Sequence, residues 1–164
     1  MWYNVPWTHF LSRTPMRFLV QRLADLDFGW NRKALTADDF YRLCRRFRIK
    51  VTEMPLKTDG FYYRVMGRDF IAVNSRLSGS IKLLVLFLEL GHFLFHTPES
   101  GATANFHGAG GSVRKEREAD TFALCSLLPQ RMIETRSFDE IADETGLPEK
   151  AIADRLEIWR KHGL

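Results

Sequence analysis

The sequence has few cysteines and no long hydrophobic segment, and both features exclude classes of protein. Cys44 and Cys125 are far apart and form no CxxC pair, so neither a disulfide framework nor a cysteine-built zinc site is indicated, and we expect both to be small core residues. The apolar run from Leu83 to Leu88 is far shorter than the roughly 18 to 20 residues of a membrane span. The first residues, MWYNVPWTHFLSR, lack the cationic start and apolar core of a secretory signal. We therefore expect a cytoplasmic protein without a membrane segment.

Length and charge suit a single globular domain. The chain has 164 residues, of which 45% are hydrophobic and 27% charged, which allows one domain with a substantial core. The net charge of +4 is modest but uneven, because five basic residues crowd positions 42–50. Such a run can bind phosphate, although it is more often the solvated face of a helix, which is the interpretation we favour here. The five are Arg42, Arg45, Arg46, Arg48 and Lys50.

The pattern of apolar residues predicts a mixed α+β protein. We expect helices at 14–28, 36–47, 80–96 and 114–128, and three more starting near residues 129, 137 and 148. Capping boxes are indicated by Thr36 with Asp39 and by Ser137 with Glu140, and Gly146 suits a helix stop. Short strands are expected at 49–52, 61–66 and 70–73, the last two forming a hairpin joined by residues 67–69.

The central helix, SIKLLVLFLELGHFLFH at 80–96, combines a polar edge with an apolar circumference. At 3.6 residues per turn, Lys82, Glu89, His92 and His96 lie on one stripe, so we expect a buried helix with one chemically distinct edge. Glu89 and His92 project from the same side. A carboxylate beside an imidazole is the minimum set for a metal-bound water and its general base.

One residue separates this helix from a zinc-protease motif. HExxH places two imidazoles four residues apart, with the glutamate directly after the first histidine. Here the corresponding residues are Leu88, Glu89, Leu90, Gly91 and His92. Leu88 cannot coordinate a metal. Without one, buried Glu89 would need another partner, and Lys82 or His92 can supply it.

A second group of acids lies on the helix predicted at 114–128. Glu116 and Asp120 share one face with small alanines, which would let another helix approach closely, whereas Glu118 projects nearly opposite. The preceding stretch, 97–113, is rich in glycine and small polar residues and reads as a loop. It contains His107, a candidate ligand that we do not favour.

Taken together, VLFLELGHFLFH and EREADTFALCSLLP resemble the ImmA/IrrE family of zinc metallo-endopeptidases over about residues 36–160. The resemblance implies a zincin-like α+β domain, in which a small β-sheet packs against the HExxH-type helix and terminal helices complete the fold. It divides the chain into an N-terminal aromatic and helical extension, 1–35, and a metallopeptidase domain, 36–164, whose terminal helices are helix-turn-helix-like.

The resemblance also implies roles for individual residues. In that family two histidines and a glutamate hold zinc, and the motif glutamate acts as the base. By position, Glu89 matches the catalytic base, His92 the second histidine ligand and Glu116 the third ligand, with Asp120 behind the ligands; Glu118 is the alternative to Glu116. The first histidine is replaced by Leu88. His96 is a disfavoured substitute, because Glu89 would then precede both histidines.

Three functional hypotheses follow. In the first, the chain is an active zinc endopeptidase in which Leu88 is compensated or engineered. In the second, it is a family member with a degraded zinc site that acts on or binds a protein or peptide, such as a transcriptional repressor, with weak or no proteolysis. In the third, it is a DNA-binding protein. The third depends on Ala142, Gly146 and Ile152, which are spaced as in a helix-turn-helix. Acids outnumber bases over 137–164, so nucleic acid is the least favoured partner.

Overall fold

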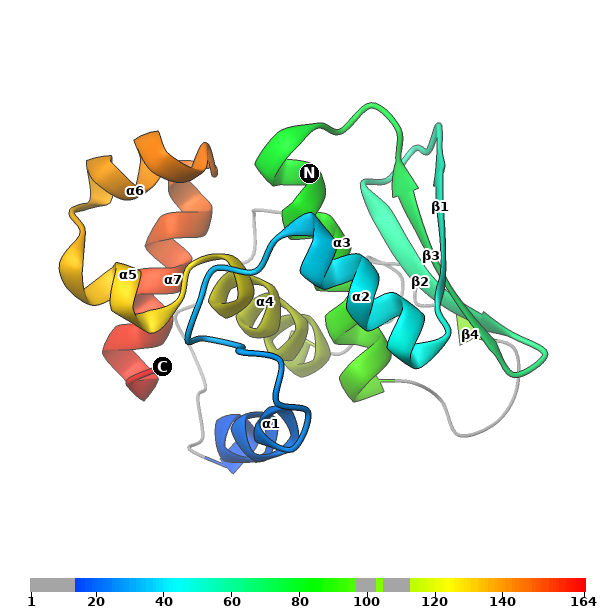
Figure 1. Cartoon of the computed structure of the whole chain (residues 1–164), viewed down its shortest axis with the longest axis horizontal. Helices are drawn as coiled ribbons and strands as arrows, with labels where there is room; N and C mark the ends of the chain where they lie inside the picture. Colours follow the sequence, from blue (N-terminus) through cyan, green and yellow to red (C-terminus); the bar gives the residue numbers. More distant parts are fainter. Residues whose placement is uncertain (1–13, 97–102, 105–112) are drawn as a thin grey trace.

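The computed structural model describes residues 14–96, 103–104 and 113–164 (Figure 1). The described strands form a four-stranded sheet in the order β1-β3-β2-β4. The sheet packs on α3, α3 packs on α4, and α4 in turn packs on α7. The elements in chain order are α1 (Thr14–Ala24), α2 (Ala37–Phe47), β1 (Lys50–Met54), β2 (Gly60–Val65), β3 (Arg68–Asn74), α3 (Gly79–His96), β4 (Thr103–Ala104), α4 (Val113–Leu127), α5 (Gln130–Thr135), α6 (Phe138–Thr145) and α7 (Glu149–His162).

The expected helix signals are confirmed with one exception. The Thr36–Asp39 capping box starts α2, and the Ser137–Glu140 box starts α6. Gly146 ends α6 in the left-handed conformation, with φ of 63°. The first helix, however, ends at Ala24, well before residue 28. The chain there turns through left-handed residues, which are incompatible with a continuing helix: Asp27 (φ 41°), Gly29 (φ 85°) and Asn31 (φ 58°).

The hairpin is present, but its turn is tighter than expected. β2 pairs antiparallel with β3, and Val65 lies opposite Arg68, so only Met66 and Gly67 form the turn. Both have positive φ, 50° and 73°, as in the two-residue turns that match strand twist. The predicted 67–69 connection was wrong because methionine is an unusual residue at such a position. β1 runs parallel to β3, and β4 pairs with β2 inside the stretch expected to be a loop.

Helix α3 forms the centre of the core. It is the one helix among the described residues that is long and apolar enough to cross a membrane, with a mean hydropathy of 1.4 over 18 residues, yet 61% of that window is buried inside the protein. It packs on β2 and β3 on one side and on α4 on the other. At Gly91 an added Cβ would come 3.1 Å from the Cα of Ala119, so the absence of a side chain permits the close approach of α4.

The N-terminal segment shares this core. Leu19, Leu23 and Leu35 belong to the same buried cluster as residues of α3 and α4. The Trp30 indole donates to the carbonyl of Phe122 at 3.0 Å, and the amide of Leu35 donates to the carbonyl of Ser126 at 2.8 Å. These bonds attach the α1–α2 loop to α4.

Both cysteines are buried and free, as expected. Burial raises the pKa of Cys44 to about 12 and that of Cys125 to about 11. The neutral thiol is the unreactive form, so these residues contribute packing only.

Candidate functional site

The polar edge of α3 is deeply buried. Glu89 is fully inaccessible, and His92 and Leu88 are almost so. Beside Glu89, the chain of β2 passes at Gly60, where an added Cβ would lie 3.5 Å from the Cγ of Glu89 and only 2.8 Å from Val85. A glycine at position 60 therefore lets the strand pass close to the side chain of Glu89, the residue that the sequence analysis places as the base.

Helix α4 brings a carboxylate to each histidine of α3. The Oε2 atom of Glu116 lies 3.5 Å from Nε2 of His92, and Oε2 of Glu118 lies 2.9 Å from Nε2 of His96. The sequence predicts that Glu118 projects nearly opposite to Glu116, yet in the structure both side chains reach a histidine of α3. The two helices are so close that glutamates on either flank of the contact reach histidines one turn apart on α3.

His92, His96 and Glu118 form a chain of polar contacts between α3 and α4. Arg114 Nε donates to Oε1 of Glu118 at 2.8 Å and so fixes the position of this side chain. Burial lowers the pKa of His96, against the opposing effect of its bond to Glu118, and so favours the neutral ring. A neutral His96 that donates from Nε2 to Glu118 accepts at Nδ1, where His92 Nδ1 lies 3.1 Å away.

The same contacts orient His92. Its Nδ1 faces His96 at 3.1 Å, and its Nε2 lies 3.5 Å from Oε2 of Glu116. In metal sites the ligating histidine is held in the same manner, with its other ring nitrogen bonded to an orienting partner.

The remaining candidates have other positions. Both ring nitrogens of His96 are engaged, so its geometry suits orienting His92 rather than replacing the missing ligand. Lys82 donates to Glu53 on β1 at 2.7 Å. Lys82 and Glu89 are about 10 Å apart along the axis of α3, so the suggestion that Lys82 is the partner of Glu89 is corrected. Asp120 is partly buried on α4. His107 lies outside the described residues.

Among the described residues, α3 and α4 bring together two of the three protein ligands that a catalytic zinc site needs. Such a site needs three protein ligands and one open position. His92 and Glu116 offer two, and the position one turn before His92 is the buried aliphatic chain of Leu88. Within residues 14–96, 103–104 and 113–164, no cluster of three or more His, Cys, Asp and Glu side chains has the arrangement of a metal site.

Two residues here were not identified from sequence. Arg114 fixes Glu118, and its i, i+4 spacing to that residue is a signal that would have found it. Gly60 has no such signal, because its role depends on how β2 packs on α3.

The sheet, the buried glutamate–histidine helix and the acid-bearing partner helix form a domain of α+β architecture. The family model of the IrrE N-terminal-like domain (Peptidase_M78) matches residues 44–157, more than half of the chain, and the protein belongs to that family. The family is typically zinc-dependent and acts on protein substrates. No curated protein and no solved structure gives a significant match.

Proposed function

We propose that this protein is a non-hydrolytic member of its family, one that binds a protein or peptide segment without cutting it. The observation that carries the proposal is the buried Leu88, one turn before His92, where the family motif requires a nitrogen donor. Disturbing even an orienting partner typically weakens metal binding by about 10 to 100-fold, so loss of one ligand in three weakens it further. His92 and Glu116 are two remaining donors of an incomplete site, with Asp120 behind them.

The part of the fold that we propose for binding is the region where β2, α3 and α4 meet. Gly60 of β2 lies against Glu89 there, and Glu116 of α4 lies beside His92. We assign the partner to the regulatory, repressor-type proteins that the family resemblance suggests.

A cleavage assay tests the loss of hydrolysis. The unaltered chain, Glu89→Gln, Leu88→His, and Leu88→His combined with Glu89→Gln are each incubated with fluorescein-labelled casein and one equivalent of zinc. We expect no cleavage above background from the unaltered chain, measurable cleavage from Leu88→His, and its loss in the double variant, because Glu89 then has no carboxylate to act as base. Cleavage by the unaltered chain that Glu89→Gln abolishes would instead support an active endopeptidase.

A further inference from the structure

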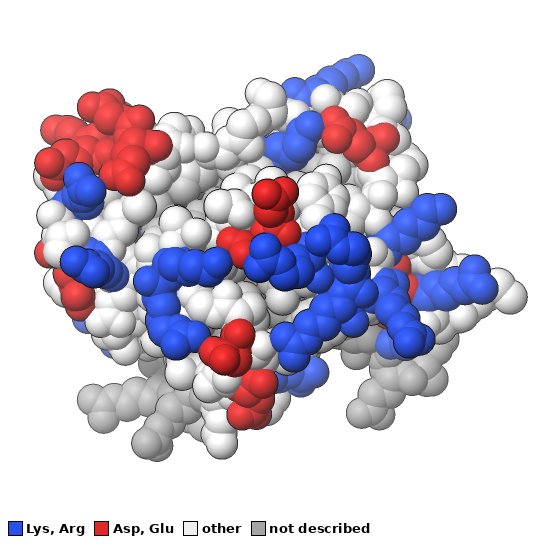
Figure 2. Space-filling model, in the orientation of Figure 1, with Lys and Arg blue, Asp and Glu red and all other residues white. Residues whose placement is uncertain are grey.

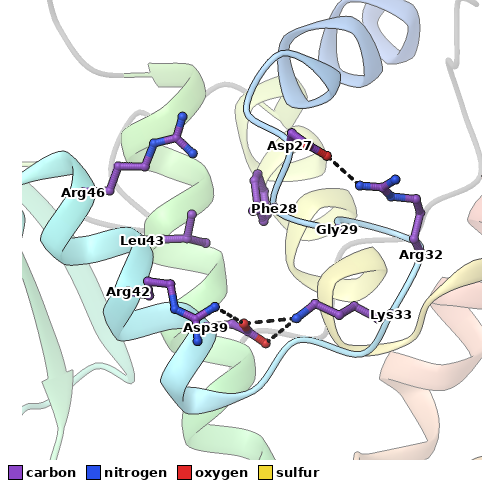
Figure 3. A pocket seen from close by; sticks show the side chains of 9 residues that line it. All are labelled: Asp27, Phe28, Gly29, Arg32, Lys33, Asp39, Arg42, Leu43 and Arg46. Carbon is purple, nitrogen blue, oxygen red and sulfur yellow. Dashed lines mark hydrogen bonds and ion pairs between the residues drawn. The ribbon is translucent and has the colours of Figure 1, made fainter.

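A separate pocket lies between α2 and the loop that joins α1 to α2 (Figure 3). Its volume of about 560 Å³ lies within the roughly 300 to 1,000 Å³ of small-molecule sites. Four cations line it, against two carboxylates, so its lining is positively charged. The cations are Arg32, Lys33, Arg42 and Arg46, and the carboxylates are Asp27 and Asp39.

The lining contains ion pairs of two kinds. Arg32 bonds Asp27 at 2.7 Å, with both side chains more than two thirds exposed. Lys33 and Arg42 share Asp39 at 3.2 and 3.3 Å, and both cations are more than half exposed, whereas the Asp39 side chain is only 12% exposed. Because exposed pairs contribute little to stability, a phosphate group that accepts bidentate guanidinium bonds can replace Asp27 at Arg32 at little cost. The exposed donors of Lys33 and Arg42 can bind the same group while both keep their contact with Asp39.

Arg46 is held at the pocket by a bond that uses little of its donor capacity. Its Nη1 donates to the carbonyl of Leu26 at 2.8 Å, and a guanidinium has five N–H donors in all. Figure 3 shows Arg42 and Arg46 on α2, facing the loop across the pocket. Figure 2 shows that Lys and Arg side chains gather across the centre of this face, whereas acids gather over the terminal helices.

The wall of the pocket also provides an apolar surface on a preorganised loop. Phe28 and Leu43 line it, and the Phe28 ring packs edge-on against Phe122 with centroids 6.3 Å apart. The left-handed Asn31 is fixed by Arg155, whose Nη2 donates to its Oδ1 at 2.9 Å. A loop already held in its bound shape loses little entropy on binding.

From this charge, volume and apolar wall we infer that the pocket binds a phosphate-bearing small molecule with a planar body, of the class of nucleoside mono- and diphosphates. Most of the lining precedes residue 44, where the family match begins, so the site is a feature of this chain's N-terminal part. It shares no lining residue with the α3–α4 site and is independent of the function proposed above.

Calorimetric titration of the whole chain with ADP tests the inference, with AMP, adenosine and inorganic phosphate as comparison ligands. Arg46→Ala and Arg42→Ala each remove one lining cation. Arg45→Ala is the matched control, because Arg45 is exposed on the same helix, carries the same charge and does not line the pocket. We expect ADP to bind, adenosine and inorganic phosphate each to bind at least about tenfold more weakly, and Arg46→Ala to weaken ADP about tenfold or more while Arg45→Ala has little effect.

Any one of the following results would overturn the inference. If no probe binds at millimolar concentration, there is no such site. If adenosine binds as tightly as ADP, the cations do not contribute to recognition. If inorganic phosphate binds as tightly as ADP, the apolar wall does not contribute. If Arg45→Ala weakens binding as much as Arg46→Ala, general surface charge is responsible and not the pocket.

Discussion

His92 and His96 face each other through their Nδ1 atoms at 3.1 Å, and Glu118 fixes the far side of His96. This contact sets the orientation of His92 and directs its Nε2 toward Glu116. The orienting contacts characteristic of a metal-binding histidine are thus present around His92. The proposed loss of one zinc ligand at Leu88, with these surroundings retained, is the pattern expected if the fold serves a purpose other than hydrolysis.

Arg155 should be a major stabilising residue of the terminal helices. Its fully buried guanidinium donates to the carbonyls of Leu128 and Leu164 and to the side chain of Asn31. We expect Arg155→Met to lower the free energy of unfolding by about 2 to 4 kcal/mol, because buried acceptors lose their donor. Urea denaturation measures this loss.

Arg160→Met is the matched control for that experiment. Arg160 lies on the same helix, is largely exposed and pairs with Glu157, so its loss should destabilise the protein much less than the loss of Arg155. Equal destabilisation by the two variants would show that the buried bonds of Arg155 have no special importance.

Asp39 should make stability depend on acid pH. Burial opposes ionisation of this carboxyl, but hydrogen bonds from the backbone of Thr36 and from Lys33 together hold its pKa below the usual value of 3.8. A lowered folded pKa adds stability that is fully present above the unfolded pKa and is lost as pH falls through the folded pKa. Asp39→Asn should therefore cost about 1 kcal/mol at pH 7 and progressively less below about pH 4.

Asp38→Asn serves as the comparison, because Asp38 is exposed in the same first turn of α2 but is not the capping-box residue. Thermal unfolding of both variants from pH 7 to pH 2 measures the difference. A cost for Asp39→Asn that does not shrink in acid would contradict the assignment.

The thiols should be inert in the native protein. Since burial raises the pKa of Cys44 to about 12 and of Cys125 to about 11, almost no thiolate exists at pH 8. Ellman's reagent should label neither residue in the folded chain and both in guanidinium. Rapid labelling of one thiol without denaturant would show that its surroundings open.

The sequence predicted what depends on local periodicity and missed what depends on packing between elements. The stripe carrying Glu89 and His92 was evident, because helical spacing alone places the two on one side. The contacts of Glu118 with His96 and of Lys82 with Glu53 were not predictable, because each depends on how a neighbouring element packs against α3. The left-handed Met66 also ran against the usual residue preferences of a turn.

Zinc content tests the central claim most directly. The unaltered chain, Leu88→His and Leu88→Gln are purified, dialysed against zinc and then against zinc-free buffer, and analysed by mass spectrometry of metals, with circular dichroism to verify folding. We expect about one zinc per chain in Leu88→His and almost none in the unaltered chain or in Leu88→Gln, which adds polarity without a nitrogen ligand. One tightly held zinc per unaltered chain would contradict the account.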